Sequence, residues 1–204
     1  MPHIIAIAGP VGSGKTSLTR VLAQCLDDAA TLYFDDYERI THNPAGDLVQ
    51  WLQQGADINS FVIPGLADDL ARLKQGESIV HPATGATLHP RKYIIFEMPL
   101  GKEHGETAPF IDLVLWIDLP ADLALTRKLR EYTGDFLARP VGNDYRSSLA
   151  WLHNYLDNYQ LFIGDVLAVQ RERIAPHADL RLDGRDAPER MAQQAAAFVR
   201  ATLP

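Results

Sequence analysis

The residues best suited to chemistry lie near the start of the chain, in the run Gly9-Pro10-Val11-Gly12-Ser13-Gly14-Lys15-Thr16. This run fits the pattern G-x-x-x-x-G-K-[ST] at every fixed position. Glycine is required where the backbone turns with positive φ and approaches a ligand closely, so that successive N–H groups point at phosphate oxygens. Lys15 would place its ammonium on the β and γ phosphates, and the Thr16 hydroxyl would bind Mg²⁺. The residues expected to hold the triphosphate are Gly9, Gly12, Ser13, Gly14, Lys15, Thr16 and Ser17.

Two elements must position this loop. The apolar run at 3–8 predicts a strand leading into it, and the residues from Ser13 onward predict a helix whose positive dipole end faces the same anion. The alternatives are a glycine-rich turn that binds nothing and a dinucleotide-binding loop. The second fits poorly, because the glycines are spaced G-x-x-G-x-G and not G-x-G-x-x-G. The pattern therefore favours nucleoside triphosphate binding.

Two further acidic positions follow predicted strands. Asp35, Asp36 and Tyr37 come directly after a strand at 31–34, and Glu97 ends a strand at 93–96. Ligands bind at the carboxyl ends of parallel strands, where a carboxylate can accept the proton of an attacking hydroxyl or orient Mg²⁺ and its waters. We expect the strand at 31–34 to neighbour the phosphate loop. The alternatives are a solvated acidic turn at 35–38 and a capping role for Glu97.

A third group lies on a helix predicted from Leu123 onward, where Arg127 and Arg130 share one face. Their planar guanidinium groups suit phosphate oxygens. The region 127–142 carries glycines and is predicted to be a lid over the triphosphate. A solvated basic face paired with Glu131 is the competing interpretation.

The region from about 38 to 90 is predicted to be an insertion that covers the acceptor. It contains turn-like residues, helical patterns at 48–54 and 66–75, and two extended segments at 78–81 and 87–89 that suit a hairpin. Asp57 and Trp51 are candidate acceptor contacts, although Trp51 suits a core position equally well.

The rest of the chain completes a single domain over residues 1–204. A buried strand is predicted at 111–118, a long helical stretch at 144–175, a last strand at 178–183 and a closing helix at 187–201. Alternating strands and helices indicate an α/β fold with a mostly parallel sheet covered by helices on both faces. With the phosphate loop, this pattern predicts the three-layer P-loop NTPase fold.

Composition narrows the partners and the compartment. The chain has 204 residues, 47% of them hydrophobic, and a formal net charge of −7, which argues against nucleic acid or an anionic membrane as a partner. Cys25 is the one cysteine, expected to be a small buried side chain, so a reducing cytoplasm is predicted. No apolar run reaches the ~18 residues that span a bilayer, and the seven histidines show no metal-ligand spacing.

With these residues in hand, the chain resembles the uridine kinase and phosphoribulokinase group of P-loop kinases along nearly its whole length. The matching parts are the phosphate loop at 9–16, Asp35-Asp36-Tyr37, the helix from Pro64-Gly65-Leu66 to Gly76, Ile95-Phe96-Glu97, Asp118-Leu-Pro-Ala-Asp122, Arg127 to Glu131, and the closing helix and strand at 159–184. This resemblance implies transfer of the ATP γ phosphate to a hydroxyl of a small molecule, with ATP and Mg²⁺ as cofactors.

The resemblance also implies roles for single residues. Asp35 would be the base for the acceptor hydroxyl, Glu97 would help to organise Mg²⁺, and Arg127 and Arg130 would stabilise the transferred phosphoryl group. The expected acceptor contacts are Asp35, Asp36, Tyr37, Asp57 and Arg91. The residues leave open whether Asp35 or Asp36 is the base. A homodimer is a further expectation.

The sequence also departs from the family at two places, which leaves the acceptor open among nucleosides, sugars and vitamin precursors. Glu38 stands where the family has an aromatic residue, and Met-Pro-Leu-Gly follows Glu97 in place of Gly-Ile. Two rival functions remain. A nucleoside monophosphate kinase would need arginines around the acceptor, for which Arg39, Arg72 and Arg91 are candidates, and a P-loop switch or ATPase would act on a protein partner.

Overall fold

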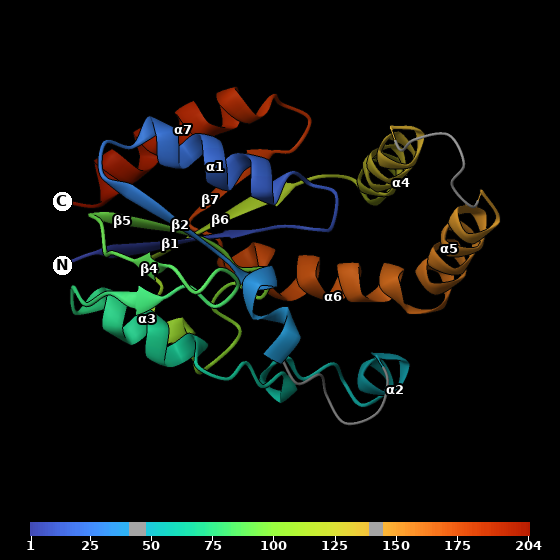
Figure 1. Ribbon diagram of the computed structural model, residues 1–204, viewed down its shortest axis with the longest axis horizontal. Coiled ribbons are helices and arrows are strands. Elements are labelled where there is room, and N and C mark those ends of the chain that lie inside the picture. The colour runs from blue at the N-terminus through green and yellow to red at the C-terminus, as the bar shows by residue number, and fades with distance from the viewer. Residues whose placement is uncertain (41–47, 139–144) are drawn as a thin grey trace.

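The computed structural model describes residues 1–40, 48–138 and 145–204, without the side chains of residues 38–40. Its centre is a sheet of five parallel strands in the order β2-β5-β1-β6-β7. Their bounds are β1 His3–Ala8, β2 Ala29–Tyr33, β5 Tyr93–Glu97, β6 Leu113–Asp118 and β7 Leu180–Asp183. Because all five run in one direction, their carboxyl ends meet at one edge, where the phosphate loop lies (Figure 1).

Helices cover both faces of this sheet, as Figure 1 shows. Helices α1 (Lys15–Cys25) and α7 (Pro188–Thr202) lie on one face, and α3 (Leu66–Lys74) and α6 (Gly164–Arg173) lie on the other. The alternation of side chains along the strands separates two apolar cores. In β1, Ile4 belongs to the core under α3, whereas its neighbour Ile5 belongs to the core under α1 and α7. The predicted three-layer α/β architecture is confirmed.

The remaining elements gather around the carboxyl edge and the α3 face. They are the 3₁₀ helices η1 (Phe34–Ile40), η2 (Ile58–Ser60), η3 (Ala108–Phe110) and η5 (Ala175–His177), the helices α2 (Leu48–Gln53), α4 (Ala121–Leu137) and α5 (Tyr145–Asn158), the π-helical turn η4 (Tyr159–Ile163), and the antiparallel strands β3 (Ile79–Val80) and β4 (Thr87–Leu88).

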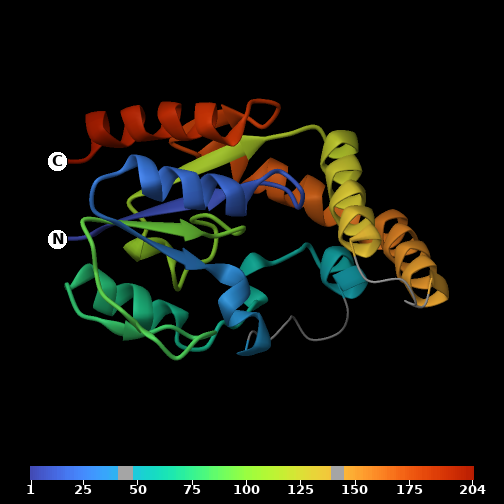
Figure 2. The ribbon, with the colours of Figure 1, turned by 45° about the horizontal axis from the view of Figure 1, so that its top comes forward.

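Helices α4 and α5 project from the body beyond the carboxyl edge of the sheet (Figures 1 and 2). Aromatic rings join them: Tyr132 of α4 stacks on Trp151 of α5 with ring centroids 3.7 Å apart, and Trp151 stacks on Tyr155 at 5.3 Å. A stacked aromatic series gives this pair a contact of its own, separate from the two cores under the sheet.

Most predicted elements are present, with shifted bounds. The predicted strand at 31–34 is β2 at 29–33, and β5 separates it from β1, the strand that leads into the phosphate loop. The long helical pattern at 144–175 is divided by the π-helical turn into α5 and α6. Cys25 is half-buried beside the core under α1 and α7. Residues 41–47 and 139–144, with parts of the predicted insertion and lid, lie outside the described residues.

No helix in the described parts of the chain is long and apolar enough to cross a membrane.

Candidate active site

The phosphate loop connects the end of β1 to the start of α1, and its glycines are required by close contacts. A Cβ atom on Gly9 would lie 2.8 Å from the Ser13 Oγ and 3.0 Å from the Ile117 carbonyl oxygen. Gly12 has a φ of 78°, and a Cβ there would collide with the Ala124 carbonyl of α4. Glycine is therefore required at both positions, because a side chain there would collide with neighbouring atoms. The contact at Gly12 also shows that α4 packs directly against the loop.

Three polar side chains form the floor of the loop. The Thr16 hydroxyl donates to a Glu97 Oε2 at 2.9 Å, and the Lys15 Nζ lies 3.9 Å from the Glu97 Oε1. Lys15 Nζ also donates to the Pro10 carbonyl at 3.3 Å. Glu97 is only 6% exposed because it ends β5, an interior strand that lies between β2 and β1. The first turn of α1 and the end of β5 therefore meet at one point.

Burial controls the charges of this group. Desolvation lowers the pKa of Lys15, partly opposed by the negative charges of Glu97 and Asp35. Desolvation also raises the pKa of Glu97, opposed by Lys15 and by the hydrogen bond from Thr16. Lys15 and Glu97 thus each stabilise the charged form of the other. A phosphate or cation bound beside them would change the pKa values of both.

The same oxygens suit a magnesium ion. Magnesium binds through one or two protein oxygens together with substrate phosphates and waters, and does not need a complete protein cage. Thr16 and Glu97 supply a hydroxyl and a carboxylate beside the loop. In the described ranges no cluster of three or more His, Cys, Asp or Glu side chains could hold a metal by itself.

The two adjacent aspartates after β2 point to different surroundings. Asp35 is exposed and lines the cavity that also contains the phosphate loop. Asp36 faces His81, with its Oδ2 3.3 Å from the His81 Nε2, and is not among the described residues that line this cavity. Geometry therefore favours Asp35 over Asp36 as the group that would face an acceptor hydroxyl.

Helix α4 brings basic side chains to the same cavity. Arg127 lines it, and so do Lys128 and Glu131, which pair at 3.2 Å. Arg130 is exposed and is not among the described lining residues. Lys128 therefore lines the cavity in place of Arg130, because successive helical residues point about 100° apart and only one side of α4 faces the loop.

Several of the predicted acceptor contacts lie elsewhere in the structure. Tyr37 is buried and donates from its hydroxyl to Asp69 of α3 at 2.7 Å. Asp57 caps η2 by accepting from the Asn59 N–H. Arg91 pairs with Asp28 at 3.5 Å at the amino end of the strands, opposite the phosphate loop.

Ser13 has a local role in the described structure. Its N–H donates to the Pro10 carbonyl at 3.1 Å, and its side chain is buried beneath the loop. The predicted phosphate-binding residues that do line the cavity are Gly9, Gly12, Gly14, Lys15, Thr16 and Ser17.

The cavity that unites these groups has a volume of about 810 Å³. Its far wall comes from the second half of the chain, with Tyr155 of α5, Ile163 of η4, and Val166, Leu167 and Gln170 of α6. Lys128 and Gln170 were not among the site residues predicted from the sequence. Lys128 could have been found from its place beside Arg127, whereas nothing local marks Gln170, which reaches the cavity only through the packing of α6.

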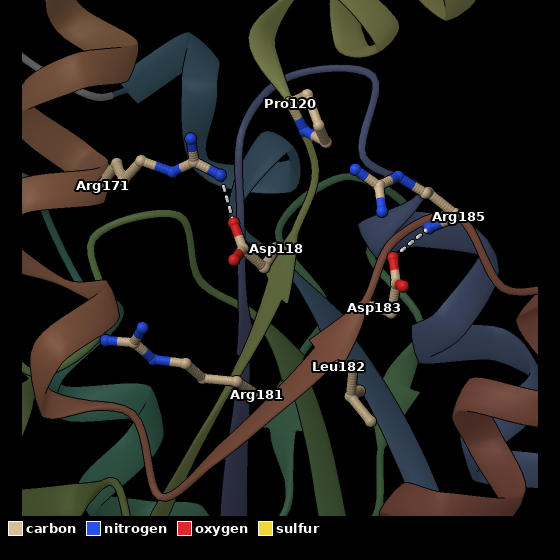
Figure 3. A pocket seen from close by; sticks show the side chains of 7 residues that line it. All are labelled: Asp118, Pro120, Arg171, Arg181, Leu182, Asp183 and Arg185. Atoms are coloured by element: carbon tan, nitrogen blue, oxygen red, sulfur yellow. Dashed lines mark hydrogen bonds and ion pairs between the residues drawn. The ribbon is translucent and has the colours of Figure 1, made fainter.

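A second cavity of about 430 Å³ lies at the ends of β6 and β7. Figure 3 shows three arginines around it. Arg171 forms an ion pair with Asp118, and Arg181 donates to the Ala175 carbonyl at 2.8 and 3.1 Å. The side chain of Arg185 extends toward Pro120, the residue that precedes α4 (Figure 3). The ring of Pro120 and the guanidinium of Arg185 thus form two walls near the phosphate loop.

Comparison with known proteins shows that the chain is similar in sequence to uridine kinases. No family model matches the chain. Over 142 residues it is 26% identical to a uridine kinase from Chlamydia pneumoniae, with 62% of each protein covered. It is 28% identical over 142 residues to a uridine kinase from Oceanobacillus iheyensis, covering 63% of this chain and 66% of that one. The matches thus span less than two thirds of these relatives.

Among solved structures, the chain is similar to shikimate kinase from Acinetobacter baumannii in complex with shikimate. The TM-score is 0.52 at 14% identity, over 100% of this chain and 97% of that chain. This likeness confirms the predicted three-layer α/β fold. The sequence matches support the predicted resemblance to the uridine kinase group of P-loop kinases.

Proposed function

We propose that this protein is an ATP-dependent small-molecule kinase that transfers the γ phosphate of ATP to a hydroxyl group. The observation that carries the proposal is that one cavity contains both the phosphate loop and Asp35. A triphosphate held by the loop and an alcohol beside Asp35 would occupy the same cavity. The similarity to uridine kinases supports the reaction class.

The chain's own residues account for the steps of such a transfer. Main-chain amides of the loop and the half-buried Lys15 hold the β and γ phosphates, and Arg127 and Lys128 neutralise charge from the α4 side. Asp35 accepts the proton of the acceptor hydroxyl while the hydroxyl oxygen forms a bond to the γ phosphorus. At the same time, the bond between the γ phosphorus and the oxygen that bridges it to the β phosphate breaks. The products are ADP and a phosphate monoester.

Magnesium fits the same arrangement. Thr16 and Glu97 would hold the ion or its waters, and the ion would neutralise charge on the β and γ phosphates. We place the base of ATP in the second cavity, between Pro120 and Arg185. A guanidinium group stacks well on an aromatic ring, and this cavity lies next to the loop.

The nucleoside monophosphate kinase alternative finds little support. Arg72 pairs with Glu77 and donates to the Ser78 carbonyl, and Arg91 pairs with Asp28. The side chain of Arg39 lies outside the described residues.

A cytoplasmic location, a homodimer and the absence of a nucleic-acid partner remain predictions from the sequence.

An acceptor screen that follows ADP release tests the proposal. Wild-type protein with Mg·ATP would be mixed in parallel with nucleosides, sugars, neutral alcohols and nucleoside monophosphates. We expect ADP release to rise well above the acceptor-free rate with at least one alcohol, and this rise to vanish in Lys15→Ala. ATP hydrolysis at one rate with every compound would contradict transfer and would favour a P-loop ATPase.

A further inference from the structure

An apolar pocket of about 220 Å³ opens beside the main cavity. It shares part of its wall with that cavity, namely Phe34, Leu48, Pro99, Val166 and Gln170. The remaining described lining residues are all apolar: Trp51, Ile58, Phe61, Leu100 and Val169. Phe34 directly precedes Asp35 in the chain, so the pocket begins next to the proposed base.

Two of these described lining residues, Trp51 and Gln170, have polar side-chain groups, and that of Trp51 already forms a hydrogen bond within the protein. The Trp51 indole N–H donates to the Asp57 carbonyl at 2.9 Å, and its ring packs edge to face on Phe61 with centroids 5.4 Å apart. The Gln170 side-chain oxygen is buried and, within the described structure, accepts no hydrogen bond. Because a buried acceptor without a partner destabilises a protein, this oxygen is suited to a ligand donor.

The size of the pocket restricts what it can hold. An apolar cavity of ~150 Å³ accommodates benzene, so about 220 Å³ holds one substituted ring or a short branched chain. No Lys, Arg, Asp or Glu is among the described residues that line it. A charged group placed there would lose its hydration without gaining a partner.

We propose that the acceptor alcohol carries a neutral, mainly apolar group of about one ring in size, and that this group fills the pocket while an N–H or O–H on it donates to Gln170. This inference rests on the proposed function and specifies its substrate class. The hydroxyl that receives the phosphate lies at Asp35, at the mouth of the pocket. Polyols and sugars are disfavoured, because most of their hydroxyl groups would lose water without gaining a partner.

The test uses two ring probes that differ in one donor: 2-pyridone, which has an N–H, and N-methyl-2-pyridone, which does not. Binding to ¹⁵N-labelled full-length protein saturated with Mg·ADP is followed through the indole N–H resonance of Trp51, assigned with Trp51→Phe. We expect 2-pyridone to bind about 2- to 10-fold more tightly than its methyl analogue, the effect of one hydrogen bond. Erythritol should leave the resonance unchanged.

Gln170→Met keeps the length of the side chain and removes the amide. In this variant both probes should bind with the same affinity, because only the ring contacts remain. Gln193→Met, at an exposed position on α7 across the sheet, is the matched control and should keep the wild-type ratio. Equal affinities in wild type, an unchanged ratio in Gln170→Met, or binding of erythritol would overturn the inference.

The same experiment separates this inference from the proposed function. Saturation with Mg·ADP is measured first by calorimetry. If Mg·ADP does not bind, the proposed kinase function fails. If Mg·ADP binds but the ring probes do not distinguish Gln170, the kinase proposal stands and the assignment of the substrate class falls.

Discussion

The two halves of the candidate active site are built in different ways. The phosphate half is centred on a continuous run of eight residues whose shape is fixed by backbone contacts, such as that of Gly12 with the Ala124 carbonyl. The acceptor half is assembled from η1, α2, η2 and α6, which are far apart in the sequence, and its surface consists of side chains. The phosphate loop binds through its backbone a chemical group that is common to many nucleotides. The acceptor site, which is formed by side chains, can differ from one relative to the next.

The largest effect should follow from a change in the phosphate half. Lys15→Ala removes the ammonium that pairs with buried Glu97 and would face the γ phosphate, so we expect turnover to fall by about 10³-fold or more. Steady-state kinetics would measure this, with circular dichroism to verify folding. Lys92→Ala, at the amino end of β5, is the control and should retain activity. Substantial turnover in Lys15→Ala would break the assignment of the loop.

The boundary between the halves is tested by two neighbouring aspartates. Asp35→Asn should leave the Kd for Mg·ATP unchanged and lower the transfer rate by a factor of about 10² or more, because an amide cannot accept the hydroxyl proton. Asp36→Asn is the matched variant, since its carboxylate faces His81, and it should change the rate little. Calorimetry and single-turnover kinetics would separate binding from transfer. The reverse ranking would make Asp36 the base.

A smaller effect is expected at the second cavity. Arg185→Ala removes the guanidinium proposed to stack on the base of ATP, so the KM for ATP should rise about 5-fold while kcat stays the same, the loss expected for one partly exposed cation–π contact. Arg190→Ala, on α7 and paired with Asp186, is the control. An unchanged KM for ATP in Arg185→Ala would contradict the placement of the ATP base in the second cavity.

The smallest effect concerns the support of the acceptor half. Tyr37 connects η1, which carries Asp35, to Asp69 of α3. Tyr37→Phe should lower the free energy of unfolding by about 1 kcal/mol, the loss of one hydrogen bond, as measured by urea denaturation. The transfer rate should fall less than in Asp35→Asn.

The stability difference between wild type and Tyr37→Phe should also depend on pH. Burial and the hydrogen bond to Asp69 raise the pKa of Tyr37 far above its usual value near 10. The unfolded chain therefore releases the phenolic proton first, and the stability from Tyr37 is present below about pH 10 and lost as the pH rises above it. The stability gap between wild type and Tyr37→Phe should narrow from pH 8 to pH 11. A constant gap would contradict the buried hydrogen bond.

The contrast between the halves also explains what the sequence could predict. The loop at 9–16 and the acidic end of β5 follow from local patterns, because glycine requirements and strand ends are properties of short segments. The strands and helices follow from hydrophobic periodicity, which reproduces β1 at its observed bounds. Local reasoning also selected Asp35 as a candidate, which stays a prediction, but it could not separate Asp35 from Asp36.

The acceptor wall could not be predicted in this way. Gln170 reaches its cavity only because α6 packs across the sheet toward η1 and α2, a tertiary arrangement with no local signal. Tyr37 and Arg91 were selected for their chemistry, but burial against α3 and a position at the opposite edge of the sheet direct them elsewhere. The place of β2 beyond β5 is likewise a matter of topology.

The most direct test of the central claim is ³¹P NMR of wild-type protein with Mg·ATP and the best neutral ring-bearing alcohol from the screen. The account predicts that the γ-phosphate signal of ATP is replaced by one phosphate monoester signal in equal amount to ADP, with little inorganic phosphate. ADP accompanied by inorganic phosphate alone, whatever alcohol is present, would contradict it.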